Sequence, residues 1–166
     1  MPTDWNAIAA YLEQQRLLLV SAESCTAGEV AALMARMDAS ARWLQCSFVI
    51  DHPGAENLVL GVAETTIRRF GATSEQVALE TAIAALDQSS ANFAIANVGH
   101  AASGRVCFAW AMLAAGWVRS STETRLFRGS ADEVRRLAAD YAVEQLPARH
   151  QELTRREQDE LRRRFA

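Results

Sequence analysis

A short apolar run that passes directly into small, polar residues constrains the fold of this chain more than any other feature. Residues 17–20 (LLLV) are typical of a buried strand. Residues 21–28 (SAESCTAG) follow at once, and apolar residues then recur at helical spacing over 30–37. The stretch predicts a strand over 17–22 that leads into a helix beginning near Thr26.

This junction carries the first candidate nucleophiles. Thr26 and Glu29 have the spacing of a capping box. A helix start presents unpaired backbone N–H groups and the positive end of the helix dipole, so it can hold an anion or a developing oxyanion. Ser24, Cys25 and Thr26 are therefore candidates for catalysis or ligand binding. Serine and threonine also favour caps and turns for local reasons, and spacing alone favours that structural interpretation.

Helices and strands alternate along the rest of the chain. This order predicts an α/β layered domain. Residues 114–116 form a turn between the last two strands, which we expect to be antiparallel, so the central sheet should be mixed. The expected helices are 4–15, 26–37, 54–60, 63–70, 73–88 and 130–146, and the expected strands are 17–22, 45–50, 93–98, 106–113 and 117–127.

The length of 166 residues fits one domain, which we place at residues 1–146. Pro147 should end the last helix of that domain. Residues 147–166 are rich in arginine and glutamate and offer only Leu153, Leu161 and Phe165 for burial. We expect this tail to be a loosely attached helix or a contact in a homo-oligomer.

Composition excludes several classes of function. All seventeen basic side chains are arginine, so there is no lysine to act as a general base or to form a Schiff base. Residues 1–100 carry a net charge of −6 and residues 101–166 one of +3, both with mixed signs, so nucleic-acid binding is not indicated. No apolar run approaches the roughly 20 residues of a membrane span.

The three cysteines lack metal-binding or redox spacing. Cys46 and Cys107 lie in apolar runs, which is typical of buried thiols in a cytoplasmic protein. The sequence also has no HxxxH, GxGxxG or P-loop motif. We therefore expect neither a metal site nor a cofactor.

Two histidines are candidate bases for a nucleophilic serine. His52 precedes Pro53-Gly54 at the end of one predicted strand, and His100 follows Gly99 at the end of another. Ligands of α/β sheets bind beyond the carboxyl ends of the strands, so Ser24, His52 and His100 could converge there. A histidine on a surface turn is the commoner outcome.

The residues also carry a family resemblance. SAESCTAG at 21–28 resembles the Ala-Glu-Ser-Cys-Thr-Gly-Gly signature of the CinA C-terminal domain, whose active members are nicotinamide mononucleotide deamidases. Similar segments continue at 60–62 (LGV), 70–78 (FGATSEQVA) and 127–129 (FRG), so the resemblance covers roughly residues 5–146. It implies a three-layer α/β/α sandwich, and it implies ligand contacts from Cys25, Thr26, Gly28, Gly99 and Arg135.

Several positions depart from the family pattern. Asp51 stands where the family has a tyrosine, and Glu56 stands where it has a lysine that is implicated beside the serine. Val98 replaces a threonine, and the arginine of a Gly-Asp-Arg element is Ala131. These changes remove cations and add an anion where the family binds a phosphorylated substrate.

The resemblance and its departures lead to two hypotheses. The first is a divergent CinA-like domain that has lost deamidase activity and serves as a binding or regulatory module, or is a degenerate paralogue. The second is an amide hydrolase with an altered substrate, in which Ser24 uses His52 or His100 as base and Asp51 or Glu56 orients the histidine. Either way the partner would be a small-molecule amide or a nucleotide-like ligand.

Overall fold

The computed structural model describes residues 3–52 and 54–164. Five strands form one sheet in the order β2-β1-β3-β4-β5. Strands β2, β1 and β3 are parallel to one another, whereas β3, β4 and β5 are antiparallel neighbours. The predicted mixed α/β sheet is confirmed. The strands are β1 (Leu19–Glu23), β2 (Leu44–Val49), β3 (Phe93–His100), β4 (Arg105–Ala114) and β5 (Trp117–Leu126).

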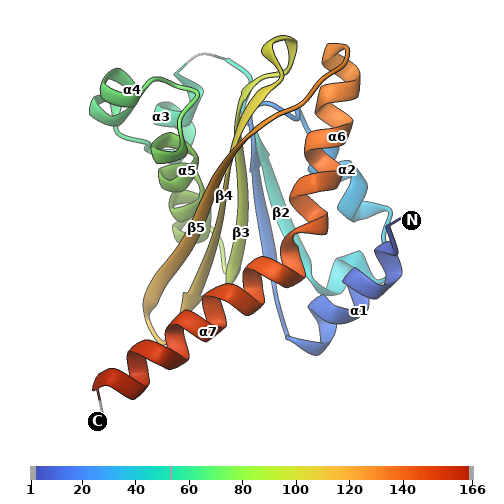
Figure 1. The fold of residues 1–166 in the computed structure, drawn as a ribbon, viewed down its shortest axis with the longest axis vertical. Helices are drawn as coiled ribbons and strands as arrows, with labels where there is room; N and C mark the ends of the chain where they lie inside the picture. The colour runs from blue at the N-terminus through green and yellow to red at the C-terminus, as the bar shows by residue number, and fades with distance from the viewer. Residues whose placement is uncertain (1–2, 53, 165–166) are drawn as a thin grey trace.

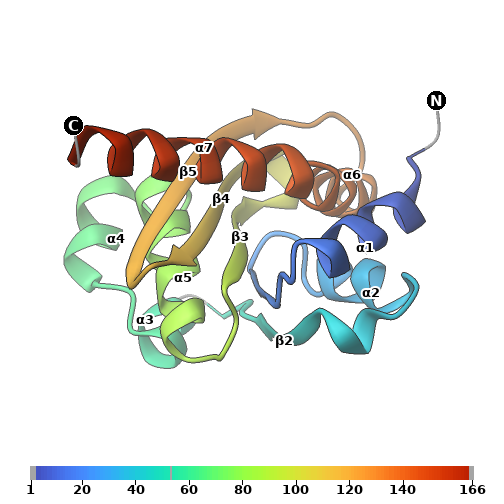
Figure 2. The same ribbon diagram turned by 90° about the horizontal axis from the view of Figure 1, so that it is seen from below.

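Helices cover both faces of the sheet. In Figures 1 and 2, α3, α4 and α5 lie on one side of it and α1, α2 and α6 on the other. Two apolar cores follow from this layering, one on each face. The helices are α1 (Trp5–Gln14), α2 (Glu29–Ala35), α3 (Ala55–Leu60), α4 (Glu64–Phe70), α5 (Glu75–Asp87), α6 (Ala131–Glu144) and α7 (Leu146–Arg164), with short 3-10 turns η1 (Ser40–Arg42) and η2 (Ala101–Ser103).

Alternation along the central strands assigns side chains to the two faces. In β3, Phe93 and Ile95 join the core under α1, α2 and α6, while Ala94, Ala96 and Val98 join the core under α5. We call these the α2 face and the α5 face.

The sequence also predicts caps at Asp4, at Thr73 with Gln76 and at Ser130 with Glu133, and these predictions are correct at some helices and wrong at others. Asp4 caps α1, and Ser130 with Glu133 forms the predicted capping box of α6. Helix α5 is capped by Ser74 rather than by Thr73, because the Ser74 hydroxyl accepts the hydrogen bond from Val77 N–H. Pro53 and Phe165, which also entered the sequence predictions, lie outside the described residues.

Helix α7 is packed on the sheet, in contrast to the loose attachment expected for the tail. It begins only two residues after α6 ends, so Pro147 lies in its first turn, where the missing N–H costs nothing. Leu153 is fully buried, and the Arg149 guanidinium lies 4.6 Å from the centroid of the Trp110 ring. Arg156 donates a hydrogen bond of 3.3 Å to the Ser120 carbonyl, so α7 covers part of the edge strand β5 (Figure 2).

Candidate functional site

The candidate site lies where β1 ends. The Ser24 N–H donates to the Asn97 carbonyl at 3.0 Å, and the Ile50 N–H donates to the Glu23 carbonyl at 2.7 Å. The parallel ladder therefore extends through Ser24, whose neighbour in register is Val98. By alternation from Ala22, the Ser24 side chain lies on the α5 face.

Glu23 fills the start of α2 with its own carboxylate. The side chain is 1 % exposed. Its oxygens accept hydrogen bonds from the Thr26 hydroxyl at 2.6 Å and from the N–H groups of Gly28 at 2.9 Å, Val30 at 3.0 Å and Ala31 at 2.8 Å. These donors satisfy a buried anion, and no cation among the described residues is in hydrogen-bond contact with it.

This arrangement corrects two sequence predictions about the junction. The N–H groups expected to be open to an anion or oxyanion are bonded to Glu23. The expected capping box of Thr26 and Glu29 is absent, because the helix begins at Glu29 after a left-handed Gly28 (φ 97°) and the Thr26 hydroxyl turns toward Glu23. The Glu23 carboxylate performs the capping instead.

Asn97 is the second polar residue that the sequence analysis missed. It is fully buried in β3. Its Oδ1 accepts from the Thr26 N–H at 3.1 Å and its Nδ2 donates to the Thr26 hydroxyl at 2.9 Å. An asparagine inside the otherwise apolar run 93–98 was the available signal, because a buried amide needs partners.

Cys25 lies in the interior of the α2 face. It is 3 % exposed and packs in the same core as Val30 and Val134. Burial raises the pKa of its thiol to about 11, an effect that the positive charge of Arg135 opposes only in part. The thiolate needed for nucleophilic attack is therefore scarce at neutral pH.

Ser24 is half-buried, and its hydroxyl makes no hydrogen bond within residues 3–52 and 54–164. Ser24, His52 and His100 do lie at one edge of the sheet, because β1, β2 and β3 are parallel and end there. Both histidines are exposed. The structure thus places the predicted nucleophile and bases at a common edge without a hydrogen bond between them.

The predicted site residues divide between the two faces of the sheet. His100 follows Val98 by two residues in β3, so it lies with Ser24 on the α5 face. Cys25 and Thr26 lie toward α2 and α6, and Arg135 of α6 forms an ion pair of 2.8 Å with Asp132 on that side. The residues expected to bind one ligand are thus separated by the sheet.

Glu56 and Asp51, at the family's lysine and tyrosine positions, differ in exposure. Asp51 is exposed in the segment between β2 and α3. Glu56 lies in the first turn of α3 and is 8 % exposed, on the same helix face as Leu60, which joins the core of the α5 face. Glu56 is therefore the inward-facing member of the pair.

Gly99 permits a close approach of two strands. A Cβ at Gly99 would lie 2.4 Å from the Arg105 carbonyl oxygen, so any side chain would separate β3 from β4. Gly28 has a left-handed φ of 97°, and its N–H is bonded to Glu23. Both glycines have structural roles, and contact with a ligand stays a prediction for each.

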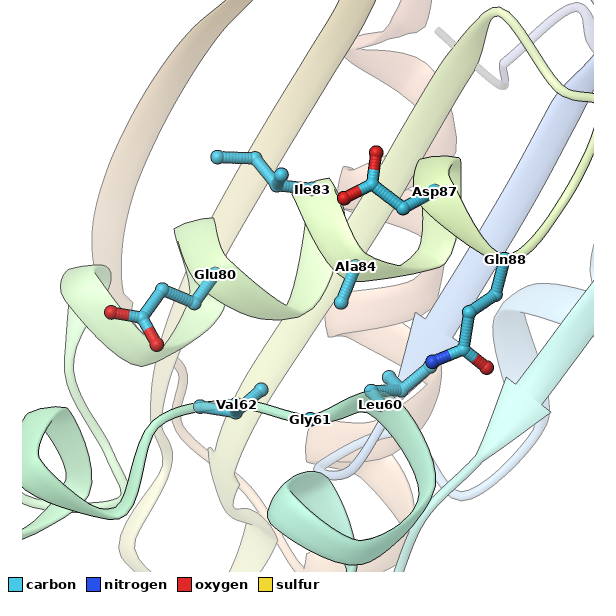
Figure 3. A pocket seen from close by; sticks show the side chains of 8 residues that line it. All are labelled: Leu60, Gly61, Val62, Glu80, Ile83, Ala84, Asp87 and Gln88. Atoms are coloured by element: carbon cyan, nitrogen blue, oxygen red, sulfur yellow. The ribbon is translucent and has the colours of Figure 1, made fainter.

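A groove of about 260 Å³ lies beside α5 (Figure 3). Its lining includes Leu60, Val62 and Asp87. Glu80 also lines it, but its carboxylate accepts hydrogen bonds from the Ala63 N–H and the Thr66 hydroxyl at the start of α4. None of the predicted site residues lines this groove.

In the described part of the chain, no three histidine, cysteine or acidic side chains are grouped so that they could hold a metal ion. Among the same residues, no helix is long and apolar enough to cross a membrane.

The fold and the junction define the class of protein: a three-layer α/β/α domain with a mixed five-stranded sheet and a Ser-Cys-Thr sequence at the carboxyl end of β1. The family model of the CinA C-terminal domain matches residues 4–149, and the chain belongs to that family. The predicted family and fold are confirmed.

Relatives and solved structures agree with this membership. The chain is 33% identical over 144 residues to nicotinamide-nucleotide amidohydrolase PncC of Escherichia coli K12, covering 81% of this chain and 86% of that protein. It is 29% identical over 150 residues to Protein YdeJ of the same strain, covering 85% of each. A competence or damage-inducible protein from Enterobacter asburiae superposes with a TM-score of 0.81 at 30% identity, covering 89% of this chain and 98% of that one.

Proposed function

We propose that this chain is a CinA-like domain that no longer deamidates nicotinamide mononucleotide and serves as a binding or regulatory module. The observation that carries the proposal is the inward-facing Glu56 at the position of the family's lysine, on the face of the sheet that also holds Ser24. A carboxylate there repels a phosphorylated substrate and cannot serve as the cationic partner of the serine.

A further observation supports the proposal. The Ser24 hydroxyl has no base in hydrogen-bond contact within the described residues, and a serine needs one to become a nucleophile.

The test is ammonia release from nicotinamide mononucleotide, with Escherichia coli PncC as positive control. We expect no release above the uncatalysed background. Release that disappears in Ser24→Ala would overturn the proposal. Release that persists in Ser24→Ala would indicate a contaminating amidase. The assay is then repeated on protein freed of that amidase, and loss of release in Ser24→Ala again decides against the proposal.

The second candidate is an amide hydrolase that uses Ser24 with a histidine base on a less anionic substrate. It is favoured by the position of His52 and His100 at the edge where Ser24 lies. A panel of uncharged primary amides separates the two candidates. Turnover that is lost in Ser24→Ala and in His52→Ala or His100→Ala would favour the hydrolase.

We also propose that the chain forms a homo-oligomer through the C-terminal half of α7, where Leu161 is 39 % exposed among charged residues. Sedimentation equilibrium of the wild type and of Leu161→Glu tests this. A monomeric wild type, or an unchanged mass in the variant, would contradict it.

A further inference from the structure

Two buried glutamates, Glu23 at the end of β1 and Glu56 in the first turn of α3, differ in their hydrogen bonds. Glu23 accepts hydrogen bonds from the Thr26 hydroxyl and from three backbone N–H groups. Glu56 is also more than nine-tenths buried, yet its carboxylate has no hydrogen bond or ion pair within residues 3–52 and 54–164. An anion taken from water without a partner is unfavourable, so the position of Glu56 requires an explanation.

The carboxylate of Glu56 is not sealed inside the protein. The fully enclosed side-chain atoms without a partner belong to Arg119 and Arg149, and the Glu56 oxygens are not among them. They therefore retain a small accessible surface. Solvent therefore touches this carboxylate, although Glu56 as a whole is only 8 % exposed.

The surroundings of Glu56 are defined by the α5 face. One turn further along α3, Leu60 packs into the core that also contains Ala22 and Val98. Ser24 continues the row of Ala22 on this face and has a hydroxyl without a partner. The edge of this face thus holds the Glu56 carboxylate, the Ser24 hydroxyl and the exposed His100, above the buried side chain of Val98.

We propose that this edge binds a small organic cation, with Glu56 as its charge partner and Ser24 as a hydrogen-bonding group. An ammonium or guanidinium group would provide the donors that the Glu56 carboxylate lacks. The inference rests on the proposed function, because a site that kept the family's lysine would attract the opposite charge. It extends the proposed binding role by naming the class of ligand, a small organic cation.

Isothermal titration calorimetry with agmatine, which carries both an ammonium and a guanidinium group, tests the proposal. Inorganic phosphate serves as the anionic comparison. We expect wild-type protein to bind agmatine and not phosphate, and Glu56→Gln to bind agmatine about tenfold more weakly or worse, since a charge-assisted hydrogen bond is lost.

Glu64→Gln is the matched control, because Glu64 occupies the first turn of the neighbouring helix α4 with its side chain 65% exposed. Equal weakening in both variants would show that agmatine senses only net charge and would overturn the proposal. Absence of agmatine binding to folded wild-type protein would overturn it as well.

The reverse substitution, Glu56→Lys, should exchange the preference, so that agmatine binding is lost and phosphate binding appears. The experiments distinguish failure of the proposed loss of deamidase activity from failure of the proposed cation site. Ammonia release from the mononucleotide overturns the proposed loss of activity, whatever the titrations show. Titrations without agmatine binding, together with no ammonia release, overturn the cation site alone.

Discussion

Ser24 and Cys25 are neighbours in the chain but lie on opposite faces of the sheet. Ser24 continues the row of Ala22 on the α5 face, whereas Cys25 packs into the core beneath α2 and α6. The Ser-Cys-Thr sequence is therefore not one cluster of nucleophiles. It consists of a serine that faces the candidate site and a thiol and threonine that help to form the junction.

Glu23 should be essential to the stability of that junction. Glu23→Ala leaves the N–H groups of Gly28, Val30 and Ala31 without their acceptor, and we expect a loss of about 3 kcal/mol in the free energy of unfolding. Urea denaturation measures the loss. Glu64→Ala, at an exposed ion pair, should cost less than about 1 kcal/mol, and similar losses in the two variants would contradict this account.

Gly104 allows the chain that leaves β5 to approach η2. A Cβ at Gly104 would lie 2.1 Å from the Phe127 carbonyl oxygen, and Gly104 has a φ of +71°. We expect Gly104→Ala to cost about 3 kcal/mol or more. Gly116→Ala is the control, since Gly116 has a φ of +79° and no atom within 4 Å; it should lose only about 1 kcal/mol. Equal thermal shifts would show that the contact is unimportant.

The order of the elements could be predicted from the sequence because hydrophobic periodicity is local. Ser130 and Glu133 were recognisable for the same reason, since both halves of their capping box lie within one turn. Thr26 has the same kind of pattern, but its hydroxyl lies nearer to Glu23 and Asn97, and Asn97 is 71 residues away in the chain. Which partner the Thr26 hydroxyl takes depends on the register between β1 and β3, and this register cannot be read from the sequence.

The sequence prediction did not place Ser24 and Cys25 on different faces of the sheet, because the predicted end of the first strand was too early. The strand was expected to end at residue 22, but β1 ends at Glu23 and its ladder continues to Ser24. Because side chains alternate at every residue, this extension decides the face on which Ser24 lies. Glu56 was identified from the family pattern, but its burial depends on how α3 packs.

Cys25 should be unreactive in the folded protein. Burial raises the pKa of its thiol from 9.0 to about 11, so little thiolate is present at about pH 8. We expect Ellman's reagent to modify Cys25 only after unfolding, as mass spectrometry of peptides would show. The unfolded thiol loses its proton first, so stability should fall as the pH rises from 9.0 to about 11, and Cys25→Ala should reduce this slope. Rapid modification in the native state would refute the expectation.

His150 connects α7 to α1 in a way that depends on pH. Its Nδ1 lies 2.7 Å from the Tyr11 hydroxyl, and burial lowers the pKa of the imidazole below its ordinary 6.5. The unfolded state therefore takes up a proton first, and the free energy of unfolding should decline as the pH falls below 6.5. Urea denaturation of His150→Gln should show a weaker decline between about pH 7 and about pH 5. Parallel curves would indicate that other groups cause the change.

Leu153 tests whether the tail is an integral part of the domain. It is fully buried between α7 and the sheet, so Leu153→Ala should cost about 3 kcal/mol through lost burial and the cavity left behind. Leu161, on the same helix, is 39 % exposed, and Leu161→Ala should cost less than about 1 kcal/mol. Both values come from urea denaturation of the full chain. A loosely attached tail would give small losses for both, whereas a packed α7 makes the two substitutions differ because only Leu153 leaves a cavity in the core.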